Sequence, residues 1–160
     1  MSHKKSQIVM TDLVVAVFIF LFLVLLVFSM WSFQNMRLQD NLNFEDMQVK
    51  AFQISNILVK SKGTPTDWEN NYTTAEMVGL AEQDRILSKV KVTNFTKMPY
   101  SNVSTLLKLG KYNTSLNISD LDGNTVTSFG NKTSGKNVVE IKRFVRYNDQ
   151  TNILSLRIWE

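Results

Sequence analysis

Two hydrophobic patterns follow one another along the first third of the chain. The stretch from Leu13 to Met36 has no charged residue, and its first part, LVVAVFIFLFLVLLVF, is apolar at every position. A hydrocarbon layer about 30 Å thick is crossed by about 20 helical residues. This run is therefore long enough to span a membrane as one helix with some tilt.

Beyond Trp31 the apolar residues recur three or four positions apart, with charged residues between them. They are the pair Leu38 and Leu42, and the series Phe44, Met47, Ala51, Ile54 and Leu58. This spacing forms a stripe on one side of a helix. We expect one helix from Gln7 to Lys62, ended by Gly63 and Pro65. Because no heptad is sustained, we expect the stripe to pack on the protein's own sheet rather than in a coiled coil with a partner.

After Pro65 the chain changes to short elements separated by polar turns. We expect short helices near 84–90 and 101–109, followed by four strands. The strands SLNISD and TVTSFG flank Asp122-Gly123-Asn124, which favours a hairpin turn. The last two strands lie in NVVEIKRFVRYNDQTNILSLRIWE and meet at 147–152. The predicted fold class is α+β, with a long N-terminal helix packed on a small antiparallel β-sheet head domain.

Composition argues against most enzyme classes. The 160 residues contain no cysteine, and the single histidine is His3. Neither a disulfide, a thiolate metal site nor a cysteine nucleophile can be built from this sequence. Because this histidine lies near the N-terminus, before the apolar run, we expect neither a Ser/His/Asp triad nor a histidine-ligated zinc site within one chain. The formal charge of +4 is too small to indicate that the protein binds nucleic acid. We expect a protein that is not an enzyme and that uses no cofactor or metal.

Charges around the apolar run predict its orientation. The basic tripeptide HKK precedes the run, whereas Arg37 beyond it is soon offset by Asp40. The positive-inside rule then places the N-terminus in the cytoplasm. A cleaved secretory signal has a shorter apolar region and a small-residue exit site, which this run lacks. We expect a single-pass anchor in the cell membrane, with the residues beyond Trp31 outside the cell.

The order of these features resembles a known family. A short basic leader, Gln7 at its edge, a Thr11-Asp12 pair, an apolar helix and a β-rich head resemble archaeal type IV pilin-like proteins with a class III signal peptide. KSKGTPTDWENNY, followed by MVGLAEQDRILSKVKVTNF, is similar to their Gly-x-Pro-x-x-Trp and Gly-Leu-Ala sequences. RFVRYNDQTNILSLRIWE is similar to their last hairpin.

The resemblance implies a processing site and a division of the chain. A membrane-embedded prepilin peptidase would cut between Ser6 and Gln7. The implied segments are the leader 1–6, the transmembrane and filament-core helix 7–31, its amphipathic continuation 32–62 and the extracellular head 63–160. Family members most often have glycine before the cut, where this chain has Ser6. Many also have an acid at the fifth mature position, where this chain has Thr11.

Asp12 lies one place after that fifth mature position. A carboxylate at the edge of an apolar span is costly when it is unpaired at depth, so Asp12 needs either a cation or the interface. In a filament, the free amine of a neighbouring Gln7 is one such cation. Headgroup level is the alternative, because the helix dipole favours an acid near the helix start. The sequence supports both equally.

Six Asn-x-Ser/Thr sequons lie on the side predicted to be extracellular. They begin at Asn71, Asn94, Asn102, Asn113, Asn117 and Asn131. Each is either a glycosylation site or an unmodified turn residue. The segment 120–131 lacks the glycine and acid positions of an EF-hand loop, so we expect a turn there rather than a calcium site. We expect the Lys and Arg residues of the last hairpin on its solvent face, not in a nucleic-acid patch.

Two functions remain open at this point. The first is a structural subunit, major or minor, of an archaeal type IV pilus-like cell-surface filament for adhesion or surface contact. Its partners would be the membrane, prepilin peptidase, and identical or related subunits. The second is a single-pass membrane-anchored extracellular protein that binds a partner and does not polymerise.

Overall fold

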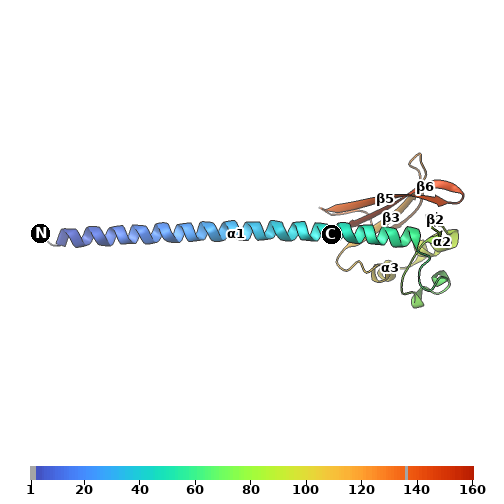
Figure 1. The fold of residues 1–160 in the computed structure, drawn as a ribbon, viewed down its shortest axis with the longest axis horizontal. Coiled ribbons are helices and arrows are strands. Elements are labelled where there is room, and N and C mark those ends of the chain that lie inside the picture. Colours follow the sequence, from blue (N-terminus) through green and yellow to red (C-terminus); the bar gives the residue numbers. More distant parts are fainter. Residues whose placement is uncertain (1–2, 136) are drawn as a thin grey trace. The chain divides into compact units, whose positions relative to one another are not determined.

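The computed structural model describes residues 3–135 and 137–160, with the backbone alone described for residues 3–11 and 40. The chain divides into two compact units, residues 1–43 and 44–160. One α-helix, α1, covers His3–Lys60 and so contributes to both units (Figure 1). The predicted long N-terminal helix is therefore confirmed, with bounds that differ by a few residues from 7–62.

The end of α1 depends on a glycine and a buried tryptophan. Gly63 has a φ of +87°, which a glycine adopts without the strain that a side chain would add. A Cβ at Gly63 would overlap the indole of Trp68, which is buried against this turn. The Trp68 indole N–H donates a hydrogen bond to the Gly79 carbonyl oxygen at 3.0 Å. The Gly-x-Pro-x-x-Trp and Gly-Leu-Ala segments are thus joined in space.

The second unit contains a six-stranded sheet in the order β1-β2-β5-β6-β3-β4. Its strands are β1 (Ala81–Gln83), β2 (Ile86–Leu87), β3 (Asn113–Ser119), β4 (Thr125–Gly130), β5 (Val138–Tyr147) and β6 (Gln150–Trp159). All neighbouring strands are antiparallel except β2 and β5, which pair in parallel at Ile86 and Arg146. The α+β class is confirmed, but the sheet is mixed and not purely antiparallel.

Short helices connect α1 to the sheet. They are the 3-10 helices η1 (Trp68–Asn70) and η2 (Tyr72–Thr74), and the α-helices α2 (Lys89–Lys97) and α3 (Tyr100–Leu106). The helix predicted near 101–109 corresponds to α3 and is confirmed. The helix predicted near 84–90 is wrong, because this segment forms the β1–β2 turn, strand β2 and only the first residues of α2.

The cause of that error is a long-range contact. The last carbonyl groups of an α-helix have no partner within the helix. At the end of α1, the Leu58 carbonyl accepts a hydrogen bond from the Leu80 N–H at 2.9 Å, and the Val59 carbonyl accepts one from Arg85 at 3.1 Å. These bonds hold the 80–87 segment extended against α1. Its local sequence carries no sign of them.

Both predicted hairpin turns are confirmed. Between β3 and β4, Gly123 has a φ of +89°, and the Asp120 carboxylate accepts hydrogen bonds from Asn124 N at 2.8 Å and Asn124 Nδ2 at 2.9 Å. Between β5 and β6, Asn148 and Asp149 have φ values of 52° and 62°. Two positive φ values in a two-residue loop are typical of a type I′ turn.

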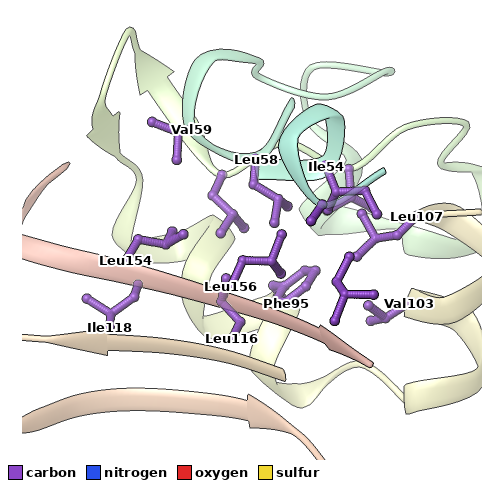
Figure 2. Packing of buried hydrophobic residues seen from close by; sticks show 14 of the residues in the cluster. Ile54, Leu58, Val59, Phe95, Val103, Leu107, Leu116, Ile118, Leu154 and Leu156 are labelled. Carbon is purple, nitrogen blue, oxygen red and sulfur yellow. The ribbon is translucent and has the colours of Figure 1, made fainter. Parts of the chain in front are cut away.

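One hydrophobic core holds the second unit together. Figure 2 shows Leu58 of α1 near Phe95 of α2 and Leu156 of the sheet, within one cluster that also contains Ile54, Leu116 and Leu154. The stripe on α1 is buried at Met47, Ala51, Ile54 and Leu58. Its packing on the protein's own sheet is confirmed for these residues. Leu38 and Leu42, which continue the predicted stripe toward the N-terminus, are exposed.

Two leucines on α1 test how much this packing contributes. Leu58 is fully buried, whereas the side chain of Leu42 is 55% exposed. We expect Leu58→Ala to lower the free energy of unfolding of the head by about 2–5 kcal/mol, because it leaves a cavity in the core. The matched change Leu42→Ala should alter it by less than about 0.5 kcal/mol. Urea unfolding of the full chain in detergent, followed by tryptophan fluorescence, measures both; equal effects would contradict this account of the core.

Candidate functional site

The first part of α1 exposes an apolar surface on all sides. Its large apolar side chains from Leu13 to Phe28 have exposed fractions between 47% and 69%. Among the described residues there is one helix that is long and apolar enough to cross a membrane, found within Asp12–Lys60. A helix that is apolar on every side needs lipid or other helices around it.

Polar and aromatic residues mark the two ends of this apolar surface. Asp12 is exposed at its start, and Trp31 is exposed at its end. At about 1.5 Å per residue these two residues are about 28 Å apart along the helix, close to the thickness of a hydrocarbon layer. Beyond Trp31, the Arg37 guanidinium lies 4.4 Å from the centre of the Phe33 ring. Tryptophan and arginine are residues typical of a membrane interface.

The predicted processing residues belong to the same helix. Ser6 and Gln7 fall within the bounds of α1, but their side chains lie outside the described residues. The predicted cut and the predicted pairing of Asp12 with a Gln7 amine therefore stay predictions. Asp12 itself is exposed, which is compatible with both alternatives for its role.

The sequons differ in how accessible their asparagines are. Asn71 and Asn131 are exposed. Asn71 Oδ1 accepts hydrogen bonds from the Thr73 N–H at 3.2 Å and from Thr73 Oγ1 at 2.6 Å. The other four are half-buried: Asn94, Asn102, Asn113 and Asn117.

Two of the half-buried asparagines show why access differs. Asn94 on α2 donates through Nδ2 to the Glu69 carbonyl oxygen at 3.1 Å. Asn117 lies in the middle of β3, between β4 and β6, and its Oδ1 is buried without a hydrogen-bond partner. A glycan on either nitrogen would have to displace these surroundings.

A tyrosine joins the loop before β3 to α1. The Tyr112 hydroxyl donates a hydrogen bond to Asp46 Oδ2 at 3.0 Å. Burial of the phenol is the largest of the effects that raise the pKa of Tyr112 to about 12, and the hydrogen bond and negative charge of Asp46 add to it. Lys50 Nζ lies 5.0 Å from the ring centre and Lys111 Nζ 5.3 Å from it.

A buried lysine holds the loop that follows α1. Lys91 Nζ donates hydrogen bonds to the carbonyl oxygens of Lys62 at 2.5 Å and Thr66 at 2.6 Å. Glu69 Oε2 lies 3.7 Å from the same ammonium group. These contacts tie the Gly63 turn to α2, so the role of Lys91 is structural.

A cationic cavity lies between α1 and β5. It has a volume of about 300 Å³, and its lining includes Lys60, Arg85, Lys142 and Arg143, together with Phe52 and Phe144. The lining contains no acidic residue. On this side of the sheet β5 borders β2, which is only two residues long and pairs with β5 at a single position.

Arg143 corrects the prediction that the charges of the last hairpin all lie on the solvent face. It stands opposite Leu154 of β6, on the face that carries the core, and it is half-buried. Its Nε donates to Ser55 Oγ at 3.4 Å, its Nη2 donates to Asn56 Oδ1 at 3.2 Å, and its guanidinium lies 4.9 Å from the centre of the Phe52 ring. Since neighbouring residues of a strand point to opposite faces, the Lys142-Arg143 pair was a usable signal that one of the two points inward.

Neither a metal centre nor a known relative accounts for these features. Within the described ranges, no group of three or more His, Cys, Asp or Glu side chains could hold a metal ion. No protein-family model, curated protein or solved structure matches the chain. The exposed apolar helix and the surface of the head are the features from which a function can be argued.

The Tyr112 contact makes the head sensitive to alkaline pH. The folded pKa of about 12 lies above the value of about 10 expected in the unfolded chain. The contribution of Tyr112 is therefore complete below pH 10 and is lost as the pH rises toward 12. We expect Tyr112→Phe to cost about 1 kcal/mol at neutral pH and to reduce the loss of stability between pH 10 and 12. Urea unfolding across this range measures it, with Tyr72→Phe as control; identical pH profiles for both variants would contradict it.

Proposed function

We propose that the chain is a structural subunit of an archaeal type IV pilus-like filament on the cell surface, acting in adhesion or surface contact. The observation that carries this proposal is the apolar helix surface from Leu13 to Phe28, which none of the described residues cover. Before assembly, lipid would cover it. In a filament, the same helix from neighbouring subunits would cover it.

The head supports the proposal by its construction. Its own core is completed by the second half of α1, so Met47 to Leu58 have no need of a partner. The apolar surface of the C-terminal part of α1 is therefore buried by the chain's own residues, whereas that of the N-terminal part is not covered by any described residue. Such a division suits a subunit that folds in the membrane and later polymerises through its free helix.

The proposed topology follows from the charges around the helix. The N-terminus would be cytoplasmic, the helix would cross the membrane once, and the head would be extracellular. Prepilin peptidase would remove residues 1–6 on the cytoplasmic side and leave Gln7 as the first residue. Asp12 would then lie near headgroup level or pair with the amine of a neighbouring Gln7.

When the helix moves from lipid into a filament core, its surroundings stay about equally apolar, because lipid tails are as apolar as leucine. Close packing between helices would then supply the stabilisation. The helix carries large side chains, such as Phe18, Phe20 and Phe22, which offer wide contact areas.

Processing is the step that tests this function most directly. The peptidase requires a small residue before the cut, so Ser6→Arg should block removal of MSHKKS and prevent filament formation. Membrane insertion should persist, because the apolar helix is unchanged. Ser2→Arg adds the same charge to the leader at another position and should be processed normally. Mass spectrometry of the N-terminal peptide and microscopy of sheared filaments measure the two steps.

The native protein provides the decisive control. Chains that begin at Gln7 and are recovered in filaments agree with the proposal. Chains that retain residues 1–6 throughout, with a head exposed on the cell surface, would instead favour a membrane-anchored protein that binds a partner without polymerising.

The sequons give an independent test of the extracellular location. If glycans are added to the folded head, they should be found at Asn71 or Asn131, which are exposed, before Asn117, whose Oδ1 is buried. Intact-protein and peptide mass spectrometry of material from the native host would identify the sites. A bare polypeptide mass would contradict the proposal that these sequons are used.

A further inference from the structure

The cationic cavity between α1 and β5 has the properties of a binding site for an acidic group. Lys60, Arg85 and Arg143 line it without an acid, and like charges brought together repel one another. Lys142 also borders the cavity, but it alternates with Arg143 along β5 and lies 3.8 Å from Glu140 on the exposed face. Lys60, Arg85 and Arg143 form no ion pair with any residue that the structure describes.

The neighbours of Arg143 orient its guanidinium group but accept hydrogen bonds from only some of its N–H donors. A guanidinium group has five N–H donors, and Ser55 and Asn56 accept from two of its nitrogens. Stacking on Phe52 restricts the plane of the group. An arginine fixed in this way suits a carboxylate, which it can bind through two parallel hydrogen bonds.

The Phe52 ring favours an apolar component in the ligand as well. Phe52 is 52% exposed although it lies in the second compact unit, whereas Phe144 lies on the other face of β5. A ligand that fits would therefore carry an apolar side chain close to one or two carboxylates.

The chain itself contains such a segment at the β3–β4 turn. In Asp120-Leu121-Asp122, an exposed leucine stands between two acids. Leu121 is 62% exposed. The hydrogen bonds from Asn124 lower the pKa of Asp120, so this carboxylate keeps its charge in mildly acidic conditions. Neither acid forms an ion pair with any of the described cations.

The turn and the cavity cannot meet within one chain. The cavity lies at the β2–β5 side of the sheet and the turn joins β3 to β4 at the opposite edge, with β6 between β5 and β3. Three hydrogen bonds fix the turn in place: Asp120 Oδ1 and Oδ2 accept from Asn124, and the Asn124 carbonyl accepts from the Asp120 N–H at 3.0 Å. A contact between them would therefore join two copies of the chain.

We propose that the Asp120-Leu121-Asp122 turn of one subunit binds in the Arg143 cavity of a second copy of this chain. Leu121 contacts the Phe52 ring, and the carboxylates face Lys60, Arg85 and Arg143. Because the two surfaces are different, the contact is heterologous and continues from subunit to subunit as a ring or a helical array. The proposal rests on the filament function given above and names the contact between heads that accompanies the packing of helices.

Charge reversal tests the pairing. Asp122→Lys and Arg85→Glu change exposed side chains, so neither should disturb the core. Since like charges would then face each other, each should reduce the amount of recovered filament by about tenfold or more. The double variant restores opposite charges and should recover most of the filament. Glu76→Lys, an exposed acid outside the turn, is the control for Asp122→Lys and should have no effect.

Cross-linking tests the same contact by position. The sequence contains no cysteine, so Leu121→Cys with Lys60→Cys, an exposed residue of the cavity lining, introduces the only thiols. In filaments of the double-cysteine variant, oxidation should give a ladder of dimers, trimers and longer chains on a non-reducing gel. Each single-cysteine variant should give no ladder.

The outcomes separate this contact from the filament proposal. Normal filaments in both reversal variants, or a reduction by Arg85→Glu that Asp122→Lys does not rescue, would overturn the contact while the filament function stands. Filaments without a cross-linked ladder would overturn it as well. Failure of the unaltered, correctly processed chain to form filaments would overturn both.

Discussion

Burial of one side of α1 against the sheet is the interaction on which the head depends. Met47, Ala51, Ile54 and Leu58 are buried in one cluster with residues of β3 and β6, and the carbonyl groups at the end of the helix accept hydrogen bonds from the segment that forms β1 and β2. The helix therefore lines one side of the core and also positions the short β1–β2 hairpin. The Tyr112–Asp46 hydrogen bond adds a polar contact near the start of this packed region.

The first part of the same helix is exposed instead of buried. There none of the described residues covers the apolar side chains, so their environment must come from lipid or from other molecules. If both halves of α1 were buried within the chain, no apolar helix surface would be left for assembly. The proposed contact between the Asp120-Leu121-Asp122 turn and the Arg143 cavity would also fix the positions of neighbouring heads, and it would be repeated at each subunit.

Features with local causes could be predicted from the sequence. The apolar run, the Gly63 helix end and the two hairpin turns each depend on a few consecutive residues whose propensities agree with the fold. The β1–β2 hairpin could not be predicted, because bonds to Leu58 and Val59 override the local preference of residues 80–87. The cationic cavity was also missed. It combines residues from α1, the β1–β2 turn and β5, which only the tertiary structure brings together.

The Trp68 contact has a consequence for recognising distantly related chains. Its indole occupies the space that a side chain at position 63 would need, and its hydrogen bond reaches the carbonyl of Gly79, where a Cβ would overlap the Ser61 carbonyl oxygen. Any side chain at Gly63 is therefore incompatible with the tryptophan, and any side chain at Gly79 is incompatible with the backbone at Ser61 and Gly63. Gly63 and Trp68 should therefore be inherited or replaced together in a divergent relative, and Gly79 should persist wherever this turn of the backbone does.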